Sequence, residues 1–219
     1  GKTIEAGLIW TELRARFDAR RLLVVCPAML QEKWQMELDT RFGVDAKIVN
    51  ASELKKELAK PKNATRSGRG LICSIQGVRP PKHSSHEEQN ARVSAKEELE
   101  IFLERQADEE AVIDLTIIDE AHHLRNPGTS SARLGLLLRD ASEHLVLLSA
   151  TPINLKEADL FNLLRLVDPD NFAQEDNFSR VLEANQPLLN ARNQILNPDT
   201  KSKLVIDSLV EARCHDLLA

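Results

Sequence analysis

Five short, mostly apolar runs, separated by stretches with helical spacing, constrain the fold of this chain more than any other feature. The run 22–26 has no polar side chain and ends at Pro27. A strand that is apolar at every position is buried on both faces, as in a parallel sheet covered by helices. We expect the five strands at residues 22–26, 46–49, 71–75, 114–118 and 144–148.

Between these runs, apolar residues recur three and four positions apart, which predicts amphipathic helices. The expected helices lie at residues 4–17, 28–41, 52–60, 94–110, 131–139 and 158–167, and within 171–219 around a break at Asn197-Pro198. The helix at 94–110 is strongly acidic, and we expect it to be a solvated insertion. Strands that alternate with helices predict an α/β fold with an open, mostly parallel sheet and helices on both faces.

The charge of the chain excludes a uniformly basic nucleic-acid binder, because its formal net charge is −5. A local basic face stays open, since steering depends on how charge is distributed. Residues 55–82 hold eight basic residues and one acidic residue, whereas residues 87–114 hold ten acidic and three basic residues. The two stretches are either solvated faces that partly neutralise each other, or a nucleic-acid face beside an acidic one.

Cysteine spacing and hydropathy exclude further classes. Cys26, Cys73 and Cys214 are far apart and form no CxxC pair, so we expect neither a disulfide framework nor a structural zinc site. No apolar stretch approaches the roughly 20 residues that a membrane helix needs. We therefore expect a protein of a reducing cytosol without a membrane partner.

The residues Gly1-Lys2-Thr3 open an amphipathic helix, which is typical of the end of a phosphate-binding Walker A loop. N–H groups at a helix start point at an anion, Lys2 would reach the β- and γ-phosphates, and the Thr3 hydroxyl would ligate Mg²⁺. On its own this three-residue match is weak, since a lysine at a helix start is commonly just solvated. The chain has no initiating Met, and we expect it to be part of a longer protein, cut inside this motif.

Asp119 and Glu120 directly follow the expected strand 114–118, which is the Walker B arrangement. A buried strand would present both carboxylates at the edge where open α/β sheets bind ligands. Asp119 would hold Mg²⁺, and Glu120 would orient and deprotonate the attacking water. The alternative is an ordinary acidic helix start after a strand.

A third motif, Ser149-Ala150-Thr151-Pro152, follows the expected strand 144–148. Small hydroxyl residues at a strand end can link a nucleotide site to the rest of a protein by hydrogen bonds. Alone, the motif is a helix-start turn with Thr151 as its N-cap.

In this order GKT, DEAH and SAT resemble motifs I, II and III of the superfamily-two helicases. The blocks that surround them narrow the resemblance to the Swi/Snf family of helicase-like, double-stranded-DNA translocases, and to its bacterial branch that includes an ATPase that recycles RNA polymerase. These blocks are GKTIEAGLI, LLVVCPAMLQEKWQMEL, ICSIQGVR, IIDEAHHLRN and LLSATPINLKEADLFNLLRLVDP. The resemblance implies a RecA-like (P-loop NTPase) lobe at 1–170 that lacks its N-terminal strand, and a helical extension at 171–219 toward a second lobe elsewhere in the parent chain.

The same resemblance implies ATP hydrolysis with ATP and Mg²⁺ as cofactors, coupled to stepping along duplex DNA without strand separation. Turnover would be slow without the second lobe, which carries the family's arginine finger. The implied partners are the phosphate backbone of double-stranded DNA and RNA polymerase or another DNA-bound protein, in a bacterial cytosol or nucleoid. An RNA helicase, a restriction-type motor and a nucleotide-responsive scaffold remain alternatives.

The resemblance also assigns residue roles. Gly1, Lys2 and Thr3 would bind ATP, with Thr3 and Asp119 at the metal and Glu120 as the catalytic residue. Coupling of the nucleotide state to DNA and to the second lobe would use His122, Ser149 and Thr151. DNA phosphates would contact residues 27–34 and the group Ser74, Gln76 and Arg79. Such contacts would be independent of base sequence and sensitive to salt.

Overall fold

The computed structural model describes residues 1–62, 69–81, 93–106, 110–149, 157–196 and 202–213. Contacts within the chain divide it into two compact units, Gly1–Val167 and Asp168–Ala219. Each unit is considered by itself, and Thr151 lies outside the described residues.

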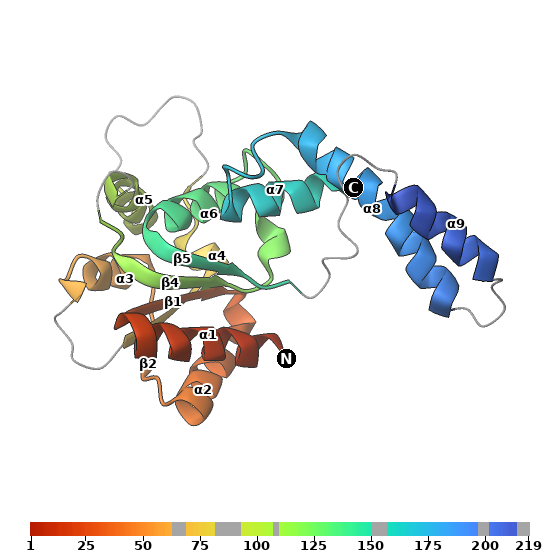
Figure 1. Cartoon of the computed structure of the whole chain (residues 1–219). Helices are drawn as coiled ribbons and strands as arrows, with labels where there is room; N and C mark the ends of the chain where they lie inside the picture. Colours follow the sequence, from red (N-terminus) through yellow and green to blue (C-terminus); the bar gives the residue numbers. More distant parts are fainter. Residues whose placement is uncertain (63–68, 82–92, 107–109, 150–156, 197–201, 214–219) are drawn as a thin grey trace. The chain divides into compact units, whose positions relative to one another are not determined.

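The first unit is built on a five-stranded sheet in which every pairing is parallel (Figure 1). Its strand order is β2-β3-β1-β4-β5. The strands are β1 (Arg21–Cys26), β2 (Ala46–Ile48), β3 (Arg69–Ser74), β4 (Ile113–Ile118) and β5 (Ser142–Leu147). The predicted α/β fold with a parallel sheet is confirmed, and the carboxyl ends of all five strands lie at one edge.

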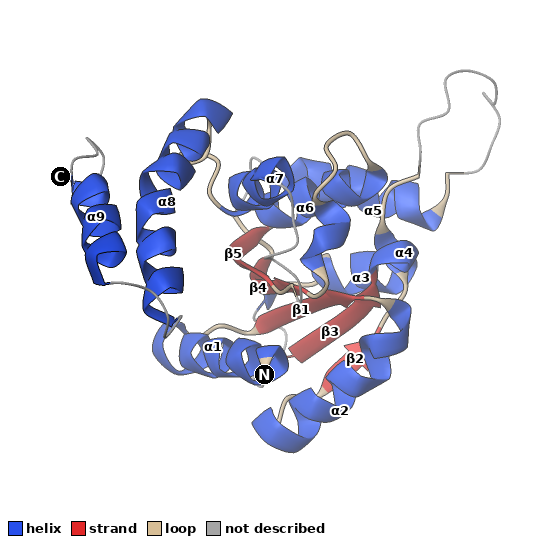
Figure 2. Ribbon diagram, turned by 90° about the vertical axis from the view of Figure 1, so that its right-hand side faces the viewer, coloured by secondary structure: helices blue, strands red, loops and turns tan. Residues whose placement is uncertain are grey.

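Helices cover both faces of this sheet (Figures 1 and 2). One face carries α1 (Lys2–Phe17) and α2 (Gln31–Phe42), which follows the short η1 (Ala28–Leu30). The other face carries α3 (Ala51–Leu58), α4 (Ile75–Val78), α5 (Ala95–Arg105), α6 (Ser130–Asp140) and α7 (Glu157–Val167), and η4 (Ala121–Leu124) follows β4. In β1, Leu22 packs in one cluster with Trp10, while the next residue, Leu23, packs on the opposite face with Leu99. Both faces are covered, which explains why β1 is apolar throughout.

Side chains at the helix ends account for where several helices start and stop. Asn50 accepts a hydrogen bond from the backbone of Glu53, whose side chain bonds back to Asn50, so a capping box starts α3. Ser94 starts α5 in the same way. The helix α2 ends at Gly43, whose φ of 60° is a left-handed conformation that favours glycine.

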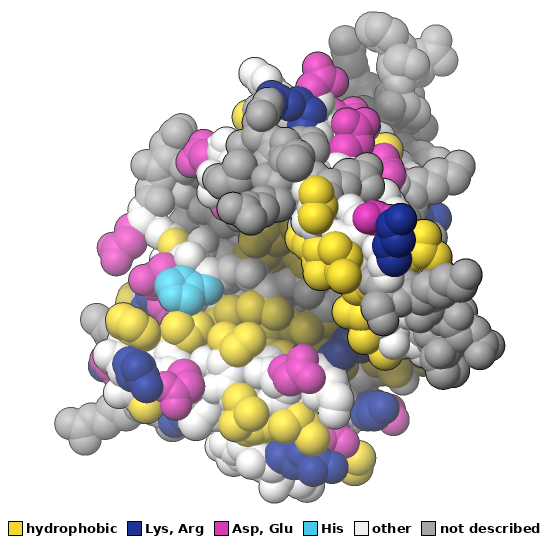
Figure 3. All heavy atoms as spheres, turned by 45° about the vertical axis from the view of Figure 1, so that its right-hand side comes forward, with side chains coloured by type: hydrophobic (Ala, Val, Ile, Leu, Met, Phe, Trp, Pro, Cys, Tyr) yellow, Lys and Arg dark blue, Asp and Glu magenta, His cyan; other side chains and the backbone are white. Residues whose placement is uncertain are grey.

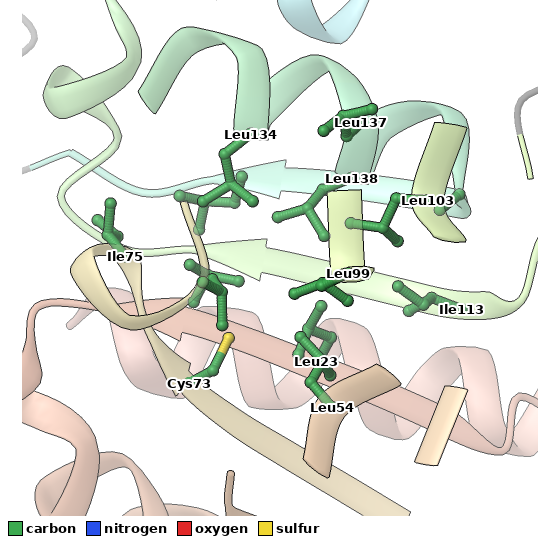
Figure 4. Packing of buried hydrophobic residues seen from close by; sticks show 14 of the residues in the cluster. Leu23, Leu54, Cys73, Ile75, Leu99, Leu103, Ile113, Leu134, Leu137 and Leu138 are labelled. Carbon is green, nitrogen blue, oxygen red and sulfur yellow. The ribbon is translucent and has the colours of Figure 1, made fainter. Parts of the chain in front are cut away.

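The expectation that the acidic helix is a solvated insertion is wrong. Leu99 and Leu103 of α5 are fully buried and belong to the same core cluster as Ile113 and Leu138 (Figure 4). They stand four positions apart and so share one apolar face of α5, and the acidic Glu100 beside Leu99 is buried as well. The high acidic content of this stretch obscured that spacing, and α5 is part of the core.

The strand β5 lies at one edge of the sheet and is less buried than its neighbours. Each of its residues is half-buried or exposed, whereas all six residues of β4 are buried. The second unit consists of α8 (Glu175–Leu196) and α9 (Ser202–Arg213), which pack against each other. Among the described helices, none combines the length and the hydropathy needed to cross a membrane.

Candidate nucleotide site

The carboxyl edge of the sheet brings the start of α1 to the end of β4. The ammonium Nζ of Lys2 lies 3.6 Å from Oδ1 of Asp119 and 3.6 Å from Oε1 of Glu120. The Lys2 side chain is 35% exposed, and the Asp119 side chain is 10% exposed. Three residues that sequence reasoning placed at one site, from two motifs far apart in the chain, thus converge on one point.

Backbone hydrogen bonds fix both sides of Glu120. The N–H of Asp119 donates to the carbonyl of Val25 at 2.8 Å, and the N–H of Ala121 donates to the carbonyl of Leu148 at 2.9 Å. Between them Glu120 adopts φ 52° and ψ 47°. This left-handed conformation costs a non-glycine residue roughly 1–2 kcal/mol, and such strain concentrates at functional sites.

Trp34 contributes a contact that the sequence did not reveal. It is buried, with 2% exposure. Its indole Nε1 also donates a hydrogen bond of 3.0 Å to Oδ2 of Asp119. No pattern in the sequence signals this bond, because it joins side chains of α2 and of the residue after β4.

The oxygen-rich character of the site fits a hard divalent cation. The carboxylates of Asp119 and Glu120 converge on the Lys2 ammonium, so a positive charge is already favourable there. Thr3, in the first turn of α1, adds a half-buried hydroxyl group at the same helix start. Among the described residues no three His, Cys, Asp or Glu side chains cluster, so water molecules and phosphate oxygens would complete the shell of Mg²⁺.

Two residues that were expected to couple the nucleotide state to DNA, His122 and Ser149, lie around this point. His122 Nδ1 lies 3.2 Å from Oε2 of Glu120, although the two groups are not aligned for a hydrogen bond. Ser149 follows Leu148, whose N–H donates to the carbonyl of Ile118, so the end of β5 stays beside the end of β4. The roles of these residues stay predictions.

The residues expected to contact DNA lie at the same edge: residues 27–34 follow β1, and Ser74, Gln76 and Arg79 lie at and after the end of β3. Ser74 accepts a hydrogen bond of 3.0 Å from the N–H of Gly77 and caps α4, while Gln76 and Arg79 are exposed. In the segment 27–34, Met29 is 86% exposed and Trp34 is buried, so only the residues before Trp34 are available to a ligand.

The basic and acidic stretches are joined by ion pairs. Lys55 of α3 bonds Glu98 of α5 at 3.0 Å, and Lys62 bonds Asp114 at 3.0 Å. On the face seen in Figure 3, the Lys and Arg side chains of the described residues lie beside Asp and Glu and form no continuous basic patch. These contacts favour mutual neutralisation of the two stretches.

Comparison with known proteins decides the family. The sequence profile described as SNF2-related domain matches residues 1–209. The chain belongs to the SNF2-related family. Family membership agrees with the resemblance that the motifs carry and with a helicase-like ATPase.

Relatives and solved structures of this family agree with the assignment. The chain is 31% identical to the RNA polymerase-associated protein RapA of Yersinia enterocolitica over 225 aligned positions, and equally to that of Yersinia pestis. These alignments cover 100% of this chain and 21% of RapA, so the chain spans about a fifth of these relatives. The fold is also similar to a Sulfolobus solfataricus SWI2/SNF2 ATPase core solved with dsDNA, with a TM-score of 0.52 and 14% identity, over 97% of this chain and 51% of that one.

Proposed function

We propose that this chain is the ATP-binding lobe of an ATP-dependent translocase on double-stranded DNA, which uses Mg²⁺ and moves along DNA or displaces bound protein. The observation that carries the proposal is the convergence of Lys2 on Asp119 and Glu120 at the carboxyl edge of the sheet. An adjacent pair of carboxylates beside a helix-start lysine suits phosphoryl transfer, in which binding and electrostatics supply most of the catalysis.

Each residue then has a separate task. The N–H groups at the start of α1 and the ammonium of Lys2 would bind the phosphates of ATP. Thr3 and Asp119 would hold Mg²⁺, which neutralises phosphate charge when bound. Glu120 would orient the attacking water and accept its proton, and its ion pair with Lys2, at the start of α1 where the phosphates would bind, supports this role.

The relatives suggest which partners this protein has and where in the cell it acts. RapA is an RNA polymerase-associated protein and the solved SWI2/SNF2 core binds dsDNA, so we propose a DNA-bound complex in the bacterial cytosol or nucleoid. Turnover would require a second RecA-like lobe, because an arginine from outside the first lobe completes such sites.

The test is the ATPase rate of the intact protein with duplex DNA, single-stranded DNA or RNA, in the wild type and in Glu120→Gln. We expect stimulation by duplex DNA that falls as salt rises. E120Q should still bind ATP, but its turnover rate should fall by about a thousandfold or more, because the variant lacks the proton acceptor. The matched control is Glu143→Gln, which changes an exposed glutamate on β5 and should keep wild-type turnover. Stimulation by RNA alone, or normal turnover in E120Q, would refute the proposal.

A further inference from the structure

Trp34 connects the surface segment after β1 to the carboxylate that follows β4. Its buried indole Nε1 donates a hydrogen bond of 3.0 Å to Oδ2 of Asp119. A bond from an N–H group to a carboxylate is charge-assisted and roughly twice as strong as a neutral hydrogen bond. This contact therefore restrains the direction in which the carboxylate points.

The two oxygens of Asp119 have different partners. Oδ2 accepts from Trp34, whereas Oδ1 accepts from the N–H of Glu120 at 2.9 Å and lies 3.6 Å from the ammonium of Lys2. A rotation of the carboxylate would break the bond to Trp34. The indole thus keeps Oδ1 turned toward the ammonium of Lys2.

Trp34 also lies directly behind an exposed part of the surface. It is in the first turn of α2, next to the exposed residues Glu32 and Lys33 and shortly after the exposed Met29. A ligand that displaces this turn must move the indole, because Trp34 is packed in the cluster between α1, α2 and the sheet.

We propose that Trp34 is a positioning residue that orients Asp119 toward the metal ion and passes movements of residues 28–33 to it. The inference rests on the proposed function, since it takes Asp119 as the metal ligand. Residues that orient a metal-binding carboxylate typically change metal affinity by about 10–100-fold when they are lost.

Trp10 provides a matched control within the same cluster. It is fully buried, and among the described residues its Nε1 has no hydrogen-bond partner. Trp34→Phe and Trp10→Phe remove the same atoms from one core, but only W34F removes a bond to Asp119. Because Trp10 lies on the helix that carries Lys2, a general packing defect near the site would appear in W10F as well.

The first measurement is the Mg²⁺ concentration that half-saturates binding of a fluorescent ADP analogue to the intact protein. W34F should need about tenfold more Mg²⁺ or more, and W10F should match the wild type within about twofold. An equal Mg²⁺ requirement in both variants would overturn the inference. A wild-type protein that binds no Mg²⁺-ADP would instead refute the proposed function.

The second measurement needs only the wild type and W10F, so it stands even where W34F fails to fold. Fluorotryptophan is incorporated into the protein, and its signals are recorded by fluorine NMR. The signal that Mn²⁺ broadens most and that is retained in W10F is assigned to Trp34. Mg²⁺-ADP should shift this signal and leave that of Trp10 in place, and duplex DNA without nucleotide should shift it too. If Mg²⁺-ADP leaves the Trp34 signal unshifted, the positioning role is overturned. If DNA leaves it unshifted, the transmission of movements from residues 28–33 is overturned.

Discussion

Replacing Asp114 should weaken the fold in a pH-dependent way while leaving the nucleotide site intact. This side chain lies near the amino end of β4, at the edge of the sheet opposite to Lys2. Its Oδ2 accepts from the N–H groups of Arg20 at 2.8 Å and Arg21 at 2.7 Å, and its Oδ1 accepts from Lys62 Nζ at 3.0 Å. Burial raises the pKa of Asp114, but these donors together outweigh it, and the net pKa lies below the ordinary value.

The contacts set the size of the effect. Asp114→Asn keeps a carbonyl oxygen for the two N–H groups but loses the charge and turns an NH₂ group toward Lys62, which should cost about 1–3 kcal/mol. Asp114→Ala leaves both N–H donors without an acceptor, at about 1–3 kcal/mol each. The second loss is a large part of a typical stability of about 5–15 kcal/mol.

The assay is urea unfolding of the intact protein across pH, with Asp140→Asn as the control. Asp140 pairs with Arg139 at the surface, where such a pair contributes about 0–1 kcal/mol. Because the pKa of Asp114 is lowered by folding, its contribution is complete above the unfolded value of about 3.9 and is lost as pH falls through the folded value. The gap between wild type and D114N should therefore be full at neutral pH and close in acid. A gap that stays constant with pH, or no gap at neutral pH, would refute this reasoning.

Two further predictions concern backbone strain and buried thiols. Glu120→Gly should be about 1 kcal/mol more stable than Glu120→Ala, because only glycine adopts φ 52° without strain, and thermal unfolding of the two variants would show it. Burial, and to a lesser degree the charge of Asp119, raises the pKa of Cys26 to about 12, and burial raises the pKa of Cys73 as well. Both thiols should therefore react with a disulfide reagent at pH 8 far more slowly in native protein than in urea, as mass spectrometry of labelled peptides would measure, and rapid native labelling of Cys26 would contradict this.

Sequence periodicity predicted the strands and the main helices because it encodes which faces are buried. The run 22–26 specifies a strand covered on both sides, and the capping sequence at Asn50 specifies a helix start. The convergence of Lys2 with Asp119 and Glu120 was predictable too, since the carboxyl ends of parallel strands meet at one edge.

Strand order and side-chain contacts between elements were not predictable in the same way. The polar start of β5, Ser142-Glu143-His144, agrees with an edge strand. Its apolar carboxyl end resembles that of β4, however, and no local signal gives the order of the strands in the sheet. The hydrogen bond from Trp34 to Asp119 depends on where α2 lies relative to the residue after β4, which no spacing rule encodes. The strand expected at residues 71–75 ends one residue earlier, and Ile75 begins a helix instead. The reason is that the Ser74 side chain accepts a hydrogen bond from the N–H of Gly77 and caps α4.

The left-handed backbone at Glu120 follows from this strand order. Asp119 is bonded to β1 on one side of β4, and Ala121 is bonded to the residue after β5 on the other. The hydrogen-bond partner of the backbone therefore changes from β1 to the end of β5 within one residue. We infer that the positive φ of Glu120 makes this change possible. The same change of direction brings its carboxylate to Lys2. Because Asp119 is held further by Trp34 while Glu120 depends on the end of β5, a movement of β5 would displace Glu120, the proposed catalytic carboxylate, before it displaced Asp119, the proposed metal ligand.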